Sequence, residues 1–299
     1  MANLALQYLV EYFVKWIAML RAYLQLIRWD KPIGSLLLLW PTWWGLWLAN
    51  HGMPLLKIWL VFSLGVFLTR SAGCAMNDFA DSKFDGMVER TSKRPLVTGV
   101  LSRKNALALS ASLSLVAFGI AWACLKPITL VWSLPAVGLL ISYPFLKRFF
   151  PLPQLYLGVA FSFGIPMAYI EIVGHVPNVA WLLFGANCAW VMAYDTIYAL
   201  VDIEDDSKLG LKTSALTFGR HVVLIIMLCY ALFWFGMGLV GVLAHLKWWF
   251  FIGLALEIPL IYRVYQQIYQ LERQQCFQAF LFNNMIGLLM FIALALNYI

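Results

Sequence analysis

Residues 221–244 read HVVLIIMLCYALFWFGMGLVGVLA and contain no Asp, Glu, Lys or Arg. A helix that crosses the hydrocarbon of a bilayer needs about 20 predominantly apolar residues. The whole chain is 63% hydrophobic and 12% charged, whereas soluble domains are about half apolar and a quarter charged. The sequence therefore predicts an all-α polytopic membrane protein and excludes a soluble domain, a disordered chain and a disulfide scaffold.

Further stretches of the same kind divide the chain into predicted transmembrane helices. Nine such helices are predicted, at residues 33–49, 54–76, 105–124, 128–146, 153–172, 180–201, 221–244, 248–264 and 279–298. Residues 3–28 alternate apolar runs with Lys15, Arg21 and Arg28, which favours an interfacial helix lying on the membrane over a tenth crossing. A plain helical lead-in is the alternative for this segment.

Basic residues gather on one side of the predicted membrane. Seventeen of the 21 Lys and Arg precede the first span or lie in loops on the same side as residues 81–104 and 208–220. Since basic loops stay in the cytoplasm, we predict a multi-pass protein of a bacterial inner membrane with a cytoplasmic N-terminus. The net charge of +7 then reflects topology and attraction to membrane lipid, with no nucleic-acid partner expected.

Acidic residues are few, and most of them lie in two clusters at the predicted cytoplasmic ends of helices. Asn77, Asp81 and Asp85 are spaced by four residues, which places their oxygens on one helix face. Asp195, Asp202 and Asp206 are spaced by seven and four residues and share a face in the same way. Because ionisable groups at membrane depth are costly, each cluster needs a compensating partner.

The chemistry of the clusters predicts a metal-bound diphosphate. Crowded carboxylates repel unless a cation lies between them, and oxygen donors suit Mg²⁺, which proteins hold with a few carboxylates and the phosphates of a substrate. Basic residues such as Arg70, Arg90 and Lys208 interleave with the acids and suit phosphate oxygens. A charged site at a membrane surface implies a substrate with a charged head and an apolar tail, and polyprenyl diphosphate fits this description.

Two other interpretations compete with the metal site. Each cluster can be a solvated acidic loop that follows a helix. A divalent-cation or anion transporter is the second alternative, although transporters hold charged groups in broken helices near the bilayer midplane and both clusters here lie at one surface. The five cysteines have no Cys-x-x-Cys spacing, so no zinc or iron–sulfur site is expected.

Several motifs resemble the UbiA-type membrane prenyltransferase superfamily. The run from Asn77 to Asp85 matches its Asn-Asp-x-x-Asp-x-x-x-Asp signature. The run from Tyr194 to Asp206, followed by Lys208, Gly210, Lys212 and Thr213, resembles the 4-hydroxybenzoate polyprenyltransferase branch. So do residues 28–34, 93–96 and 142–148, and the likeness covers essentially the whole chain.

The resemblance implies nine transmembrane helices around a central cavity, in a single domain over residues 1–299. It implies an N-terminal helix over 1–30, with residues 77–104 and 202–220 forming cytoplasmic cap loops. In this family the ligands of Mg²⁺ would be Asn77, Asp81, Asp85, Asp202 and Asp206. The diphosphate would be bound by Arg28, Arg70, Lys93 and Arg94, and the carboxylate of the acceptor by Arg148.

The expected reaction follows from the electronic character of the two substrates. Ionisation of an allylic C–O bond gives a delocalised cation, which the ring carbon ortho to the hydroxyl of 4-hydroxybenzoate attacks. Asp81 and Asp202 are predicted catalytic residues through the metal, Tyr143 is predicted at the ring or the cation, and Asp195 is predicted to orient the phenol or accept a proton. Prenyl transfer to haem or to a menaquinone-type acceptor remains an alternative within the superfamily.

Overall fold

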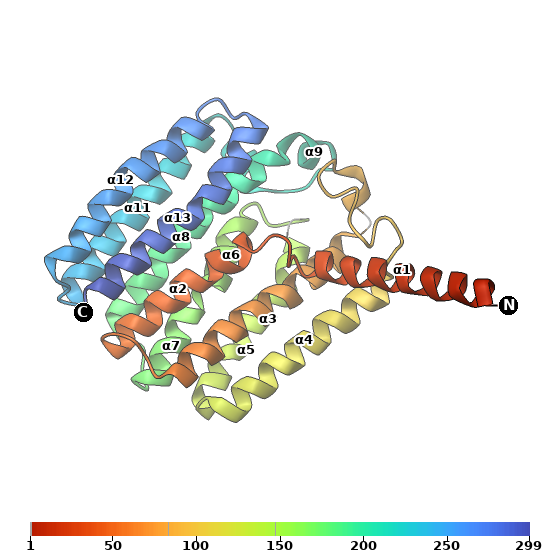
Figure 1. Ribbon diagram of the computed structural model, residues 1–299. Coiled ribbons are helices and arrows are strands. Elements are labelled where there is room, and N and C mark those ends of the chain that lie inside the picture. Colours follow the sequence, from red (N-terminus) through yellow and green to blue (C-terminus); the bar gives the residue numbers. More distant parts are fainter. Residues whose placement is uncertain (1, 83, 147) are drawn as a thin grey trace.

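The chain folds as a bundle of helices, and Figure 1 shows most of them running side by side along one direction. The computed structural model describes residues 2–82, 84–146 and 148–299, and it contains no strand within these ranges. In chain order the elements are α1 (Ala2–Leu26), α2 (Ile33–Asn50), α3 (Leu56–Asp81), η1 (Asp85–Met87), α4 (Arg103–Cys124), α5 (Pro127–Leu146), α6 (Pro153–Ser162), α7 (Gly164–Ile172), α8 (Asn178–Val201), α9 (Ile203–Lys208), α10 (Ser214–Phe218), η2 (Gly219–His221), α11 (Val222–Leu243), α12 (Trp248–Ile268) and α13 (Arg273–Leu296). The predicted all-α class is confirmed.

Each predicted span coincides with a long helix or with two consecutive short ones. Among the described residues, seven segments are long and apolar enough to cross a membrane by length and composition. The predicted spans outside this set are α2, which contains four tryptophans, and α8, which contains Asn187, Asp195 and Thr196. Both helices have many buried residues, and helices surrounded by protein carry polar groups that a lipid-facing helix cannot.

The interior of the bundle is a stack of aromatic rings between α2, α8 and α11. The ring of Trp190 lies 5.2 Å from that of Trp44 and 5.6 Å from that of Phe233, measured between centroids. The indole N–H of Trp190 and the hydroxyl of Tyr230 both donate to the side-chain oxygen of Asn283 on α13, at 2.9 and 2.7 Å. Polar contacts of this kind join helices where lipid gives no hydrophobic drive for association.

The predicted span 153–172 is divided into α6 and α7 at Phe163. Pro166 lies in the first turn of α7 and has no N–H to donate to the carbonyl of Ser162, so the helix ladder is interrupted there. A methyl group at Gly164 would overlap the side chain of Thr42 on α2. The absence of a side chain at Gly164 therefore lets the start of α7 approach α2 closely.

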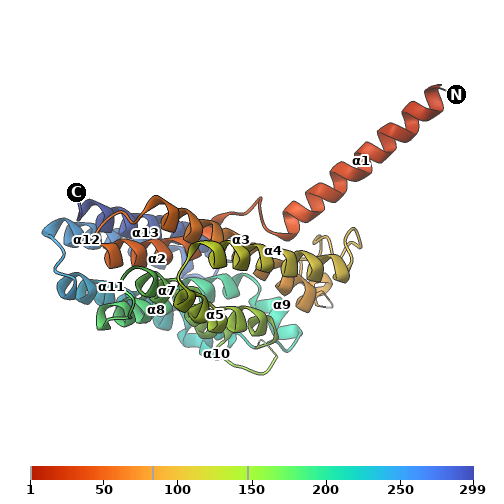
Figure 2. The ribbon, with the colours of Figure 1, turned by 90° about the horizontal axis from the view of Figure 1, so that it is seen from below.

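The second transmembrane helix is longer than predicted, because α3 ends at Asp81 instead of residue 76. Its last turns carry the first acidic cluster, and neighbouring arginines neutralise the added charge. α1 is a separate helix that leaves the bundle obliquely, as Figure 2 shows. Its exposed apolar side chains include Tyr12, Phe13 and Trp16, which fits the predicted interfacial helix; that location stays a prediction.

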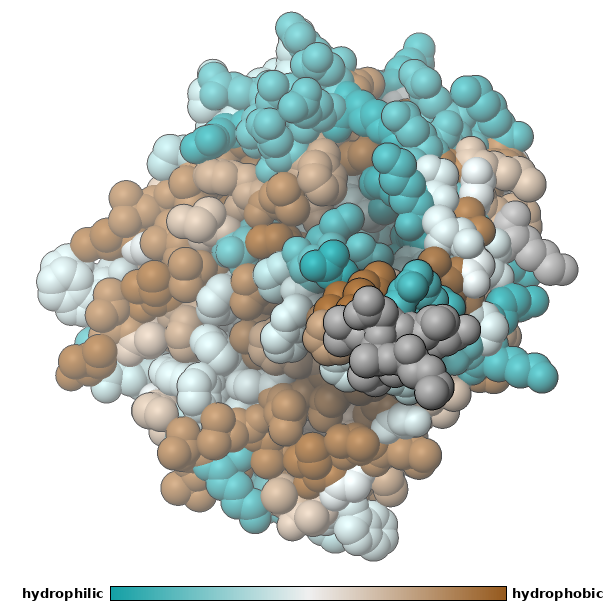
Figure 3. Space-filling view, turned by 45° about the vertical axis from the view of Figure 1, so that its right-hand side comes forward, coloured by the Kyte–Doolittle hydropathy of each residue, from teal (hydrophilic) through white to brown (hydrophobic). Residues whose placement is uncertain are grey.

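The segments 82–102 and 202–221 meet at one end of the bundle, which we call the charged end. An ion pair of 2.8 Å from Arg273 to Glu89 and hydrogen bonds from Arg90 to Asp202 join these segments to each other and to α13. Figure 3 shows hydrophilic residues gathered toward the top of the view and hydrophobic residues over much of the remaining face. The two predicted cap segments therefore lie together.

At the opposite end, Glu171 of α7 fixes the start of α5. Its carboxylate accepts hydrogen bonds from the backbone N–H of Lys126 at 2.9 Å and the hydroxyl of Thr129 at 2.7 Å. Glu171 is 5% exposed. The negative charge also lies at a helix N-terminus, where the helix dipole favours it. This contact ties α7 to α5 across a wall of the bundle.

We expect Glu171→Ala to destabilise the protein by about 2 kcal/mol, because it leaves the buried hydroxyl of Thr129 and the backbone N–H of Lys126 without their acceptor. This corresponds to a fall in melting temperature of several degrees. Thermal unfolding in detergent measures the change. Glu272→Gln, at an exposed acid, is the control. Equal melting temperatures for Glu171→Ala and the control would show that the carboxylate does not fix α5.

Candidate active site

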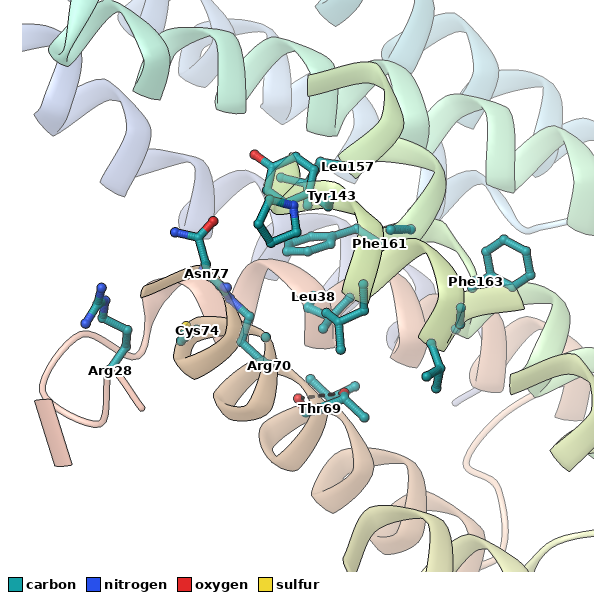
Figure 4. Close-up of a pocket in the computed structure, with 18 of the residues that line it drawn as sticks. Arg28, Leu38, Thr69, Arg70, Cys74, Asn77, Tyr143, Leu157, Phe161 and Phe163 are labelled. Atoms are coloured by element: carbon teal, nitrogen blue, oxygen red, sulfur yellow. Dashed lines mark hydrogen bonds between the residues drawn. The ribbon is translucent and has the colours of Figure 1, made fainter. Parts of the chain in front are cut away.

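A cavity of about 370 Å³ runs into the bundle from the charged end. Its mouth is polar and its interior is mostly apolar, with walls from α2, α3, α4, α5, α6, α7 and α8. Figure 4 shows Arg28, Asn77 and Arg70 toward one side of the pocket and Phe161 and Phe163 toward the other. The cavity therefore combines a charged entrance with a volume suited to hydrocarbon.

Asp78 is the buried anion at the mouth of this cavity. Its side chain is 0% exposed, and its Oδ1 accepts from Arg28 at 2.6 Å and from Arg94 at 2.9 Å. The Oδ2 atom of Asp78 has no hydrogen-bond partner among the described atoms. Arg28 reaches this position with a φ of 59°, a left-handed conformation that costs a non-glycine residue about 1 kcal/mol. Two guanidinium groups are thus fixed beside each other by one carboxylate.

Arg94 connects the end of α3 to the segment that follows it. Its Nη1 donates to Asp85 Oδ2 at 2.7 Å as well as to Asp78. Asp85 is buried in η1, where its backbone carbonyl accepts a hydrogen bond of 2.6 Å from the hydroxyl of Thr91. The local turn structure therefore places an arginine, two carboxylates and a short helix in one fixed arrangement.

Asp202 lies on the other side of the mouth, where α8 ends. The Nε of Arg90 is 3.0 Å from each oxygen of Asp202, and its guanidinium carbon is 4.8 Å from the ring centroid of Tyr198. Arg273 approaches the same carboxylate at 3.7 Å. Burial lowers the pKa of Arg90, but the nearby Tyr198 phenol and Asp202 carboxylate raise it by more, so its net pKa lies above the ordinary value. Arg90 therefore carries its charge at any physiological pH.

Arg70 is the cation deepest in the predicted site. It is within electrostatic range of Asp195, Tyr194 and Tyr143, and its guanidinium carbon lies 5.8 Å from the ring centroid of Phe161. A methyl group at Gly34 would meet the Arg70 guanidinium at 2.8 Å, so glycine there makes room for the arginine. The Nε of Arg70 is buried without a hydrogen-bond partner among the described atoms.

Most of the sequence-predicted residues line the cavity. This set contains Asn77, Asp202, Asp206, Asp195, Tyr143, Arg28, Arg70 and Arg94. Asp81 and Asp85 are not among the lining residues, although Asp81 lies within electrostatic range of the lining residue Tyr143.

Two predicted binding residues lie elsewhere. Lys93 lines a second pocket between α1 and residues 93–100. The guanidinium of Arg148 donates to the carbonyl of Ala80 at 3.3 Å, and its carbon lies 5.5 Å from the ring centroid of Phe84 and 5.6 Å from that of Phe145. Arg148 is at the charged end but does not line the cavity.

Two residues at the mouth were missed as site residues by sequence reasoning. Asp78 received no role and Arg90 was treated only as one of several bases, yet both line the cavity and both form its principal ion pairs. The adjacency of Asp78 to Asn77 in the signature was the available signal for the first. The sequence gives no signal that selects Arg90 from the neighbouring bases, because its partner Asp202 is 112 residues away.

The donor set at the mouth fits a hard divalent cation. The available ligands are carboxylate and amide oxygens on opposite sides of the cavity, which is the chemistry that Mg²⁺ selects. Within the described residues, no three His, Cys, Asp or Glu side chains converge closely enough to hold an ion by themselves. Arginine guanidinium groups instead form ion pairs with the carboxylates of Asp78, Asp85 and Asp202. This arrangement suits an ion that arrives together with phosphate oxygens.

Comparisons with known proteins identify the family. Residues 38–294 match the UbiA prenyltransferase family. A relative from Neisseria meningitidis serogroup B, named 4-hydroxybenzoate octaprenyltransferase, is 52% identical over 278 residues, which cover 92% of this chain and 93% of the relative.

Solved structures share the fold. The apo structure of a UbiA homolog from Aeropyrum pernix K1 has a TM-score of 0.78 at 24% identity, covering 89% of this chain and 98% of that one. A UbiA homolog from Archaeoglobus fulgidus, bound to GPP and Mg²⁺, has a TM-score of 0.67 at 19% identity, covering 92% and 99%. This chain, with its long apolar helices and cavity, is a multi-pass membrane protein and belongs to the UbiA prenyltransferase family.

Proposed function

We propose that this protein transfers a polyprenyl group from polyprenyl diphosphate to ring carbon 3 of 4-hydroxybenzoate, in ubiquinone biosynthesis, with Mg²⁺ as cofactor. The observation that carries the proposal is a cavity whose mouth holds both carboxylates and guanidinium groups while its interior is apolar. A diphosphate on an isoprenoid tail matches both parts of that surface. The name of the 52% identical relative supports the aromatic acceptor.

The metal ligands in this proposal are the oxygens of Asn77, Asp81, Asp85, Asp202 and Asp206. Three of them, Asn77, Asp202 and Asp206, line the cavity. The Archaeoglobus fulgidus homolog, which is bound to GPP and Mg²⁺, supports the binding of Mg²⁺ together with a prenyl diphosphate here. When bound, a divalent cation supplies Lewis-acid stabilisation of the charge on the diphosphate. The protein's own contribution is to hold the carboxylates on two sides of one opening.

The arginines at the mouth bind the leaving group. Arg28 and Arg94, both anchored on Asp78, present guanidinium donors that match phosphate oxygens. As the bond between the isoprenoid C1 and the diphosphate oxygen breaks, its electron pair stays on the diphosphate. The ring carbon ortho to the phenol oxygen then bonds to C1, and the proton on that carbon is lost to restore aromaticity.

The cavity wall protects the allylic cation formed in this step. Phe161, Tyr143 and Tyr198 line the cavity, and aromatic faces attract a cation while excluding water that would quench it. Asp195, which is within electrostatic range of Tyr143 and Arg70, orients the phenol or accepts a proton. Arg70 completes the proposed diphosphate-binding set at the cavity, and Lys93, which lines the second pocket, stays a predicted member of that set.

Arg148 is the proposed partner of the acceptor carboxylate. Its contact with the carbonyl of Ala80 places it one residue from Asp81, at the charged end. We further propose that this end faces the cytoplasm of a bacterial inner membrane, since it carries the loops with the excess of basic residues. The water-soluble acceptor then enters from the cytoplasm while the prenyl tail arrives through the lipid.

Asp202→Ala is expected to reduce turnover at least about a hundred-fold, near 3 kcal/mol, at every Mg²⁺ concentration, because it removes a proposed metal ligand. Asp205→Ala is the matched control. Asp205 lies three residues further on, contacts Arg273 at 3.8 Å and does not line the cavity. Initial rates across a Mg²⁺ titration compare the two variants. Near-normal turnover of Asp202→Ala would remove Asp202 from the site.

Asp78→Asn tests the anchoring of Arg28 and Arg94. The variant keeps the shape of the side chain but loses its charge, so both guanidinium groups lose their fixed position. We expect the KM for polyprenyl diphosphate to rise about ten-fold or more, the equivalent of one charge-assisted hydrogen bond, with the acceptor KM changed little. Asp30→Asn, at an exposed acid, should match the wild type. A fall in kcat with both KM values unchanged would contradict this positioning role.

Arg148→Lys tests the acceptor assignment, because lysine cannot reproduce the two-pronged contact of a guanidinium with a carboxylate. We expect the KM for 4-hydroxybenzoate to rise about ten-fold, near 1.4 kcal/mol, with the KM for polyprenyl diphosphate unchanged. The control is Arg220→Lys, at an exposed arginine that contacts only His221 in the described hydrogen bonds. An unchanged acceptor KM in Arg148→Lys would show that Arg148 does not bind the acceptor carboxylate.

A further inference from the structure

Asp202 is a proposed metal ligand, but in this structure its carboxylate is paired with the guanidinium of Arg90. The side chain of Arg90 engages both carboxylate oxygens of Asp202, with its Nε 3.0 Å from each and its Nη2 also bonded to Oδ2. Asp202 is only 8% exposed, so little water competes for these oxygens. A divalent cation that binds Asp202 competes with this guanidinium, because Arg90 already contacts both carboxylate oxygens and two positive groups repel each other at such short range.

The surroundings of Arg90 allow such a displacement without exposing its charge. The guanidinium lies over the ring of Tyr198, and both residues line the cavity. A cation over an aromatic face keeps a favourable contact while its direction changes. Asp85 also acts electrostatically on Arg90, and Arg273 approaches the shared Asp202 carboxylate at 3.7 Å.

We propose that Arg90 is an exchangeable counter-ion, which neutralises Asp202 in the empty site and binds the diphosphate oxygens when cation and diphosphate enter together. This inference rests on the proposed function and adds a diphosphate-binding residue to it. The exchange keeps the number of ion pairs constant, because Asp202 binds the cation while Arg90 binds the phosphate oxygens. It follows that the cation alone binds weakly and that diphosphate and cation bind cooperatively.

Removing Arg90 should therefore change two affinities in opposite directions. In Arg90→Ala, Mn²⁺ used alone as a probe no longer competes with a guanidinium, and its Kd is expected to fall about five-fold to ten-fold. The Kd for polyprenyl diphosphate at saturating Mg²⁺ is expected to rise about ten-fold, the equivalent of one charge-assisted hydrogen bond. Electron paramagnetic resonance of Mn²⁺ and calorimetry of prenyl diphosphate binding, both on the full chain in detergent, give the two values without requiring turnover.

Arg273→Ala is the matched control, because Arg273 approaches the same carboxylate at 3.7 Å but does not line the cavity. It should strengthen Mn²⁺ binding less than Arg90→Ala and leave prenyl diphosphate binding unchanged. Arg90→Lys keeps the charge without the two-pronged contact. It should therefore weaken prenyl diphosphate binding, and it should change the affinity for Mn²⁺ less than Arg90→Ala does. It also provides the test should Arg90→Ala fail to fold.

The outcomes separate the inference from the proposed function. Opposite shifts in the two affinities for Arg90→Ala support the exchange. Shifts in the same direction, or an unchanged Mn²⁺ affinity in folded Arg90 variants, overturn it and leave Arg90 as a structural partner of Asp202. A wild-type protein that binds prenyl diphosphate yet transfers nothing to 4-hydroxybenzoate overturns the proposed function, while the binding data still decide the exchange.

Discussion

The ion pairs from Asp78 to Arg28 and Arg94 connect three separate parts of the chain at the mouth of the cavity. A fully buried carboxylate is unstable without a charged partner, because removal from water costs several kcal/mol. Each arginine is equally constrained, since the chain places it beside an apolar cavity. The N-terminal segment, the end of α3 and the segment after η1 are therefore held together by charge compensation, and the cavity mouth takes its shape from them.

The membrane helices could be predicted from hydropathy with good accuracy because the bilayer imposes length and apolarity on every lipid-facing helix. α4 and α11 follow this rule and lie close to their predicted ranges. The rule weakens for α2, in which three of the four tryptophans are buried, and for α8, in which Asn187 and Thr196 are buried. Hydropathy also does not reveal the break at Phe163, because it does not register that Pro166 lacks the N–H that would donate to the carbonyl of Ser162.

The composition of the site was predictable because the close spacing of the acids groups each cluster in the sequence. The prediction that each cluster lies on one helix face was wrong, because α3 ends at Asp81 with Asp85 in η1, and α8 ends at Val201 with Asp206 in α9. Proximity across the mouth was not predictable, because it depends on the path of the segments 82–102 and 202–221. Sequence reasoning thus selected Asp202 but not Arg90, which lies on it. The sequence predicted that Lys93 and Arg94 both bind the diphosphate. In the structure their side chains point to different places, because consecutive residues outside a helix need not face the same way: Lys93 faces α1 and Arg94 lines the cavity.

Charge compensation in the empty site and recognition of the proposed substrate use the same groups. A mouth that held carboxylates alone would attract cations but repel diphosphate. A mouth that held arginines alone would be unstable, because buried positive charges beside an apolar cavity need anions to neutralise them. Pairing them within the protein solves both problems, because a cation and a diphosphate can enter as a pair and replace contacts that already exist. The contacts within the Arg90–Asp202 and Asp78–Arg94 pairs then resemble the contacts that we propose for the substrate. Binding such a substrate requires little new desolvation, so more of its interaction energy remains to hold the allylic carbon against the acceptor ring.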